Sequence, residues 1–195
     1  FIKDNKVRLY ISDERKKLLD TGGGISYASH MLVANNPEQR FLVHNVDILS
    51  NVVLRHLTSH SPKDADAILL VSKRKTSRYL VFNSNMELVG WINKQTGEIK
   101  SPFDIVKSQL QDANDESLDV NGYHLRAFAG IHLIGTGVFK FMPASSDKFS
   151  IIDFYLNNCT QLRILGYEPD NLQLVDVGKL DSLASAEQFL SKIYV

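Results

Sequence analysis

The run Ala67–Ser72, with the sequence AILLVS, constrains the fold of this chain more than any other segment. Its first five residues are all apolar, whereas a strand with one face toward solvent alternates apolar and polar residues. A run of this kind is typical of a central strand in a sheet that helices cover on both faces. We therefore expect an α/β fold in which other segments supply the neighbouring strands and helices.

Segments around this run alternate between strand and helix signals. Apolar runs predict strands over residues 7–11, 40–45, 125–134 and 172–177, and helical spacing predicts helices over residues 25–32, 51–60, 150–164 and 181–193. Short alternating runs over residues 79–98 predict a small antiparallel meander. This order predicts a single domain, residues 1–195, with a three-layer, Rossmann-like, mainly parallel sheet to which the meander is attached.

Composition excludes several classes of partner. Lys plus Arg and Asp plus Glu both number 22, so the formal net charge is zero and the whole chain exerts no general attraction on nucleic acid or an anionic membrane. The longest unbroken aliphatic stretch, Ala67 to Val71, is far shorter than the roughly 20 residues of a membrane-spanning helix. We expect a cytoplasmic protein that has neither nucleic acid nor membrane as a partner. The single cysteine, Cys159, excludes an intrachain disulfide and lies on an apolar helical stripe, which predicts a core position.

Two aspartates follow apolar strands and are candidate metal ligands. Asp47 comes directly after the run at residues 41–46, and Asp176 lies in the sequence LVDVG. Ligands of open α/β sheets bind at the carboxyl ends of strands, and Mg²⁺ in proteins is bound by one or two carboxylates together with phosphate oxygens. The alternative is that each aspartate caps a helix or pairs with a lysine.

A glycine run and a basic cluster are the other chemical signals. Thr21-Gly22-Gly23-Gly24 precedes a helix, so its N–H groups are candidates to meet a phosphate, a sugar hydroxyl or a base, although a tight structural turn explains it equally well. Residues 73–75 (KRK) together with Arg78 form a cluster that a solvated strand edge explains more simply than a phosphate site. His44 and His132 lack the spacing of a zinc site and are expected in or beside the core.

Taken together, the chain resembles the sugar-1-phosphate nucleotidylyltransferases, which make nucleotide sugars and include mannose-1-phosphate guanylyltransferases and N-acetylmuramate-1-phosphate uridylyltransferases. The order of several short motifs carries the resemblance over nearly the whole chain: LDTGGGI at residues 19–25, FLVHNVD at 41–47, AGIH at 129–132, FSIID at 149–153 and VDVG at 175–178.

The resemblance implies that a sugar 1-phosphate and a nucleoside triphosphate react, with Mg²⁺ as cofactor, to form a nucleotide sugar and pyrophosphate. It implies that Asp47 and Asp176 hold the Mg²⁺, that Thr21, Gly22, Gly23 and Gly24 bind the nucleotide, and that Gly130 contacts the sugar.

Two further residues are candidates for the sugar side of such a site. Asp153 lies in the matching motif FSIID, although a capping box with Ser150 also explains it. Lys94 ends the segment GWINK, which stands where many relatives carry Glu-Lys-Pro, and is a candidate phosphate contact. The resemblance also implies a role in nucleotide-sugar biosynthesis, of the kind that supplies the bacterial cell envelope.

The chain departs from the family pattern at its start. The glycine-rich loop with its arginine and the Pro-Lys-Pro segment are absent, so no catalytic residue is assigned in this sequence. We therefore expect that an N-terminal βαβ unit is missing and that the 195-residue chain alone is inactive. An exposed sheet edge would then associate with the missing segment or with a second copy of the chain.

Two other functions remain open at this point. A non-catalytic nucleotide-sugar-binding or regulatory module would keep the sheet and lose the chemistry. A glycosyltransferase would carry an Asp-x-Asp metal motif, which Asp64 and Asp66 match, but that pair precedes its strand instead of following it. The base and the sugar are not specified by these motifs.

Overall fold

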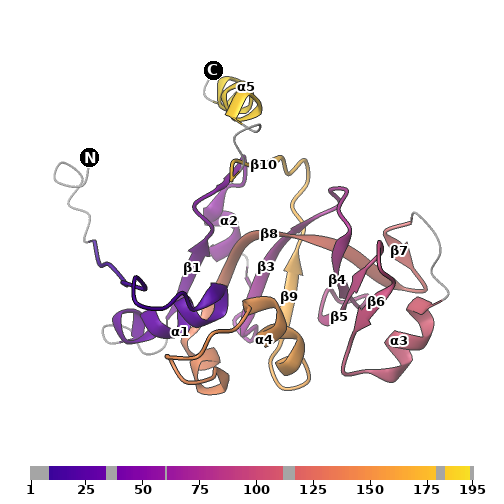
Figure 1. The fold of residues 1–195 in the computed structure, drawn as a ribbon. Helices are drawn as coiled ribbons and strands as arrows, with labels where there is room; N and C mark the ends of the chain where they lie inside the picture. Colours follow the sequence, from indigo (N-terminus) through magenta and orange to yellow (C-terminus); the bar gives the residue numbers. More distant parts are fainter. Residues whose placement is uncertain (1–8, 34–38, 60, 112–116, 179–182, 194–195) are drawn as a thin grey trace.

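The computed structural model describes residues 9–33, 39–59, 61–111, 117–178 and 183–193. Its main sheet has the strand order β6–β5–β4–β8–β3–β9, and β1 and β7 each pair with β8 (Figure 1). These strands are β1 (Arg40–His44), β3 (Ala67–Ser72), β4 (Arg78–Phe82), β5 (Leu88–Asn93), β6 (Glu98–Lys100), β7 (Asp119–Val120), β8 (Tyr123–Gly135) and β9 (Ile164–Tyr167). A separate two-stranded sheet joins β2 (Ile48–Ser50) to β10 (Leu174–Asp176). The helices are α1 (Asp20–Val33), α2 (Leu54–Ser59), α3 (Asp104–Gln111), the 3-10 helix η1 (Thr136–Phe141), α4 (Ile151–Asn158) and α5 (Leu183–Ile193).

The long strand β8 organises the sheet. Along one edge it pairs with β3, and along the other it pairs first with β4 and then with β1. On that second edge the pairing with β4 ends at Arg126 and the pairing with β1 begins at Ile131. The start of β4 and the end of β1 therefore approach each other along one edge of β8.

The α/β class and the antiparallel meander are confirmed, but the expected mainly parallel direction is wrong. Among the described strands only β3 and β9 pair in parallel, and the remaining pairs are antiparallel. The sheet is mixed. The predicted direction is wrong because an apolar run indicates that a strand is buried on both faces and does not indicate the direction of the neighbouring strands.

Helices cover both faces of the sheet, as expected for three layers. Leu69 and Val71 of β3 pack in one core cluster with Tyr155 of α4, and Ile68 and Leu70 pack in another with Leu57 of α2. On the same face as α2, α3 covers the meander through Val106 and Leu110. All six residues of β3 are buried, which explains the uninterrupted apolar sequence of this strand.

Two expected elements differ from the sequence prediction. Residues 9–11 form no strand, and the side chains of Leu9, Tyr10 and Ile11 are 63–73% exposed; residues 7 and 8 lie outside the described part. Helix α4 begins as predicted, with Ser150 as its N-cap, but it ends at Asn158, and Ile164 at the end of the predicted helix is the first residue of β9. Apolar spacing alone did not locate the turn between the two elements.

His132 is a core residue, as expected, Cys159 is partly buried against the core, and His44, expected in or beside the core, is exposed. The His132 ring is 2% exposed and shares a 2.7 Å hydrogen bond with the Tyr155 hydroxyl. Burial raises the pKa of the Cys159 thiol to about 11, which opposes formation of a nucleophilic thiolate. No helix in the described part of the chain has the length and apolar character needed to cross a membrane.

Candidate functional site

Asp47 and Asp176 come together although 129 positions separate them in the sequence (176 − 47). The chain turns after β1 into β2, and β10 pairs with β2 so that Asp176 lies opposite Ile48. The Val177 N–H donates to the Asp47 carbonyl at 2.8 Å. A Cβ on Gly178 would lie 3.0 Å from Asp47 Oδ2 and 3.2 Å from Asp176 Oδ1, so these oxygens are no farther apart than the sum of the two distances.

This arrangement fits a divalent cation that is shared with a ligand. Two carboxylate oxygens on one Mg²⁺ are at most about 4 Å apart, which the positions around Gly178 allow. Asp47 is half-buried and Asp176 is exposed, so solvent or phosphate oxygens have access to the remaining coordination positions. Within the described residues no group of three or more His, Cys, Asp or Glu side chains forms a closed metal site. The donor set therefore suits an ion that takes its other ligands from substrate and water.

Gly130 lies beside this acid pair. It has a positive φ of 74°, and a Cβ there would lie 3.0 Å from the Asn45 side chain and 3.2 Å from Ile48. The Asn45 N–H donates to the Gly130 carbonyl at 2.9 Å, which holds the segment leading to Asp47 against β8. Glycine is needed at this position both for the left-handed backbone and for the close approach of Asn45.

The glycine run does not form the expected turn before a helix. Helix α1 already begins at Asp20, so Gly22, Gly23 and Gly24 lie in its first turns. The N–H groups of Gly22 and Gly23 donate to the Phe149 carbonyl at 3.0 and 3.2 Å. The prediction of a turn is therefore wrong, and two of the N–H groups expected to meet a ligand bond to the protein instead.

The absence of side chains in this run permits close packing. A Cβ on Gly22 would lie 2.4 Å from the Phe149 ring, and a Cβ on Gly23 would lie 2.4 Å from the Asp147 carbonyl oxygen. The Thr21 hydroxyl accepts the Ile151 N–H at 3.1 Å. The segment thus fixes α1 against the start of α4, a role that the sequence gives no means of telling apart from ligand binding.

Asp153 lines a cleft of about 470 Å³ between the meander and the first turn of α4. Its carboxylate pairs with Lys100 Nζ at 3.3 Å, and this ammonium lies 5.2 Å from the centroid of the Trp91 ring. Phe128 of β8 also lines the cleft, two residues before Gly130. Neither Gly130 nor the acid pair belongs to the lining of this cleft.

Sequence reasoning missed this cleft, because its walls come from separate elements. Its lining includes Arg74, Arg78, Trp91, Lys100, Phe128 and Asp153. The basic cluster is the one signal of this cleft in the sequence, although a solvated strand edge explains such a cluster more simply. Arg74 and Arg78 of that cluster line the cleft, while Lys75 is exposed outside its lining.

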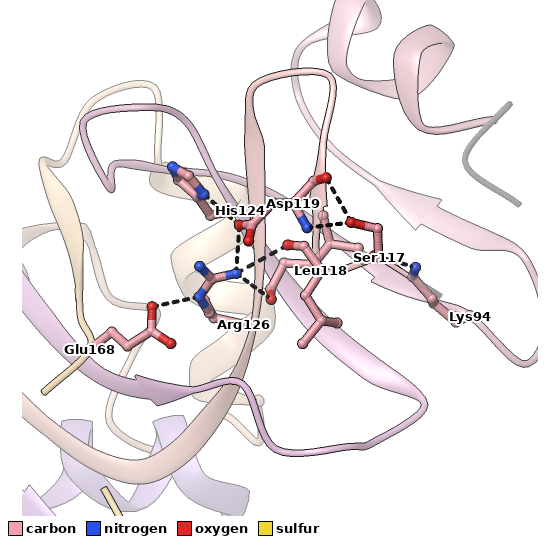
Figure 2. A network of polar contacts seen from close by, with 8 residues as sticks. Lys94, Ser117, Leu118, Asp119, His124, Arg126 and Glu168 are labelled. Carbon is pink, nitrogen blue, oxygen red and sulfur yellow. Dashed lines mark hydrogen bonds and ion pairs between the residues drawn. The ribbon is translucent and has the colours of Figure 1, made fainter. Parts of the chain in front are cut away.

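Lys94 belongs to a different polar network. Its Nζ donates to the Ser117 carbonyl at 2.9 Å, as Figure 2 shows, and it is not among the residues that line the cleft with Asp153. The structure therefore separates Lys94 from the other candidate sugar contacts.

At the centre of the network in Figure 2 is Arg126, which is 4% exposed. Its guanidinium bonds to Glu168 at 2.7 Å and to Asp119 at 3.0 Å, and it also donates to the carbonyls of Leu118 and Leu125. Burial acts to raise the pKa of Asp119, but hydrogen bonds from His124 and Arg126 outweigh it and hold that pKa below its ordinary value. These contacts tie β7 and β8 to the chain after β9.

No protein-family model and no curated protein sequence matches the chain. Solved structures do match it. HddC from Yersinia pseudotuberculosis gives a TM-score of 0.58 at 16% identity, over 90% of this chain and 64% of that one. The inositol-1-phosphate CTP transferase from T. maritima gives 0.57 at 14% identity, over 90% and 62%. A UDP-glucose pyrophosphorylase complexed with UDP-glucose gives 0.56 at 17% identity, over 90% and 64%.

These likenesses confirm the fold that the sequence resemblance implied. At such identities they establish a shared fold and assign no activity or substrate to this chain. The chain spans 62–64% of the length of these three structures.

Proposed function

We propose that this chain belongs to a sugar-1-phosphate nucleotidylyltransferase, which forms a nucleotide sugar and pyrophosphate from a nucleoside triphosphate and a sugar 1-phosphate with Mg²⁺. One observation carries the proposal. Asp47, after β1, and Asp176, the last residue of β10, converge on Gly178 in a chain with the fold of nucleotidyltransferases.

In the proposed reaction an oxygen of the sugar 1-phosphate forms a bond to the α-phosphorus of the triphosphate, and the bond from that phosphorus to the bridging oxygen breaks, releasing pyrophosphate. Asp47 and Asp176 would hold Mg²⁺, which when bound neutralises charge on the phosphate oxygens. The protein's part is mainly to position two anionic reactants, since phosphoryl transfer needs little covalent chemistry from side chains.

Other residues of the site support the same assignment. Gly130, which Asn45 and Ile48 approach closely, lies two residues along β8 from Phe128 of the cleft, where the sugar would bind beside Asp153. The nucleotide-binding role of Thr21, Gly22, Gly23 and Gly24 rests on the sequence resemblance, because the Gly22 and Gly23 N–H groups bond to Phe149. We assign no phosphate contact to Lys94, which bonds to Ser117.

We also propose that turnover requires more than this 195-residue chain, since it spans 62–64% of the matching structures. The direct test is therefore ligand binding. A panel of nucleotide sugars with Mg²⁺ should include at least one member that raises the melting temperature of the chain, and Asp47→Asn or Asp176→Asn should remove that shift. The proposal fails if no member of the panel stabilises the chain, or if both variants respond as the wild type does.

A further inference from the structure

Two arginines of the cleft have no carboxylate partner among the residues that the structure describes. Lys100 is neutralised by Asp153 at 3.3 Å and Glu98 at 3.9 Å. Within the described part of the chain, neither Arg74 nor Arg78 lies within ion-pair distance of a carboxylate; Arg74 donates to the Phe128 carbonyl at 3.2 Å. Lys100 is thus paired with two carboxylates, whereas Arg74 and Arg78 have no ion-pair partner among the described residues.

The loop that carries these arginines is held in place by hydrogen bonds. The Arg74 N–H donates to the Ser72 hydroxyl, the Thr76 N–H to the Tyr79 hydroxyl at 3.0 Å, and the Lys94 N–H to the Ser77 carbonyl at 2.8 Å. Tyr79, which anchors the loop, is 4% exposed. A fixed loop lowers the entropic cost of using its side chains to bind a ligand.

The arginines line the part of the cleft that adjoins strand β8. Arg78 is the first residue of β4, which pairs with β8 up to Arg126, while Asn45 bonds to Gly130 farther along the same edge. Gly130 lies four positions after Arg126, which corresponds to roughly 13 Å along a strand. A ligand bound beside Arg78 could therefore extend along β8 toward the segment that leads to Asp47.

We infer that Arg74 and Arg78 hold an anionic group, either phosphate or carboxylate, of a sugar that binds in this cleft. Guanidinium groups bind both kinds of anion through charge-assisted hydrogen bonds. In the same cleft, Asn93 and Asp153 offer acceptors for hydroxyl groups, and Trp91 and Phe128 supply apolar surface for the ring. The inference rests on the proposed function in taking a sugar as the ligand, and it names the residues that select an acidic one.

Calorimetric titration of the 195-residue chain in EDTA tests the inference with three ligands: glucose 1-phosphate, glucuronate and glucose. At least one of the two anionic sugars should bind about tenfold more tightly than glucose, and the stronger one identifies the anion. Arg74→Gln and Arg78→Gln should each weaken that binding about tenfold, because each removes a charge-assisted hydrogen bond. Lys75→Gln is the matched control, since it removes a charge from the same loop outside the lining of the cleft.

Equal binding of glucose and both anionic sugars would overturn the inference, as would an equal loss of affinity in Lys75→Gln, which would indicate only general surface charge. Circular dichroism melting checks that the variants fold, and we expect no change because Arg74 and Arg78 are exposed. EDTA removes any ion at Asp47 and Asp176, so this result is independent of the metal and nucleotide-sugar binding that decides the proposed function.

Discussion

At the scale of a single residue, a substitution at Gly23 tests whether close packing requires the glycine run. Replacing glycine by alanine inside a helix ordinarily stabilises the helix by about 1 kcal/mol. Here the new Cβ would lie 2.4 Å from the Asp147 carbonyl oxygen, a backbone atom that cannot move aside cheaply. We expect Gly23→Ala to lower the free energy of unfolding by about 1–3 kcal/mol in urea denaturation, because overpacking outweighs the gain in propensity.

Gly137→Ala is the control for Gly23→Ala, since a Cβ on Gly137 would meet no atom within 4 Å. It should leave the free energy of unfolding nearly unchanged. A Gly23→Ala protein as stable as the wild type would show that α1 has room to shift and that packing does not require this glycine.

His132 predicts a dependence of stability on pH. Burial lowers the pKa of this ring from 6.5 to about 3. The unfolded chain therefore takes up a proton as the pH falls through 6.5, while the folded protein does so only near pH 3, so the free energy of unfolding falls between these values. The slope reaches about 1.4 kcal/mol per pH unit.

Urea denaturation between pH 7 and pH 4 measures this dependence, with His132→Gln as the comparison. Glutamine keeps a polar partner for the Tyr155 hydroxyl and does not titrate, so the variant should lose stability less steeply as the pH falls. Identical slopes for the two proteins would mean that His132 is not held neutral in the fold.

At this same scale, the acid pair was predictable from the sequence, whereas the turn predicted at the glycine run is wrong. Asp47 and Asp176 were identifiable because each follows an apolar run, and strand ends are where open sheets bind ligands. The glycines were ambiguous because close approach to a ligand and close approach to Phe149 require the same residue type. Which of the two applies depends on a segment more than 120 positions away in the chain.

At the scale of elements, the buried Arg126 joins the β7–β8 hairpin to the chain after β9. Arg126→Gln would leave Asp119 and Glu168 without their cation, and removing one partner of a buried pair costs about 3–5 kcal/mol. Both carboxylates are partly solvated, so we expect a loss near the lower end, about 3 kcal/mol in the free energy of unfolding. Hydrogen exchange should accelerate in β7 and the first half of β8.

Arg15→Gln, which breaks the exposed pair with Asp13, is the control for Arg126→Gln and should have little effect. Equal stability of the Arg126→Gln protein and the wild type would show that the network does not stabilise the hairpin. Because the pKa of Asp119 is lowered, its contribution is complete above its ordinary value of 3.8 and is lost as the pH falls through the lower value of the folded state.

Elements were predictable where burial and sequence period agree. The β3 strand, the meander and the start of α4 follow from local pattern, since each buries the residues that the pattern marks. Strand direction and the cleft were not predictable, because both depend on how β8 places β1, β3 and β4 around itself. The apolar residues 9–11 form no strand, which shows that an apolar run without a pairing partner does not define an element.

At the scale of the whole molecule, the proposed function depends on one divalent ion that residues from distant parts of the chain would hold. The acid pair lies where β2 and β10 pair, close to Gly130 of β8, and a divalent ion held there would neutralise the charge of two anionic reactants. Carboxylate pairs of this kind bind Mn²⁺ as well as Mg²⁺, and Mn²⁺ is visible by electron paramagnetic resonance.

Titration of Mn²⁺ into the 195-residue chain, followed by electron paramagnetic resonance, tests this claim most directly. We predict one bound ion per chain, with affinity reduced at least about tenfold in both Asp47→Asn and Asp176→Asn, because each variant removes one charged ligand. Asp153→Asn, which alters an acid of the cleft, should bind Mn²⁺ as the wild type does. Undiminished Mn²⁺ binding by either Asp47→Asn or Asp176→Asn would contradict the proposal that the two aspartates share one ion.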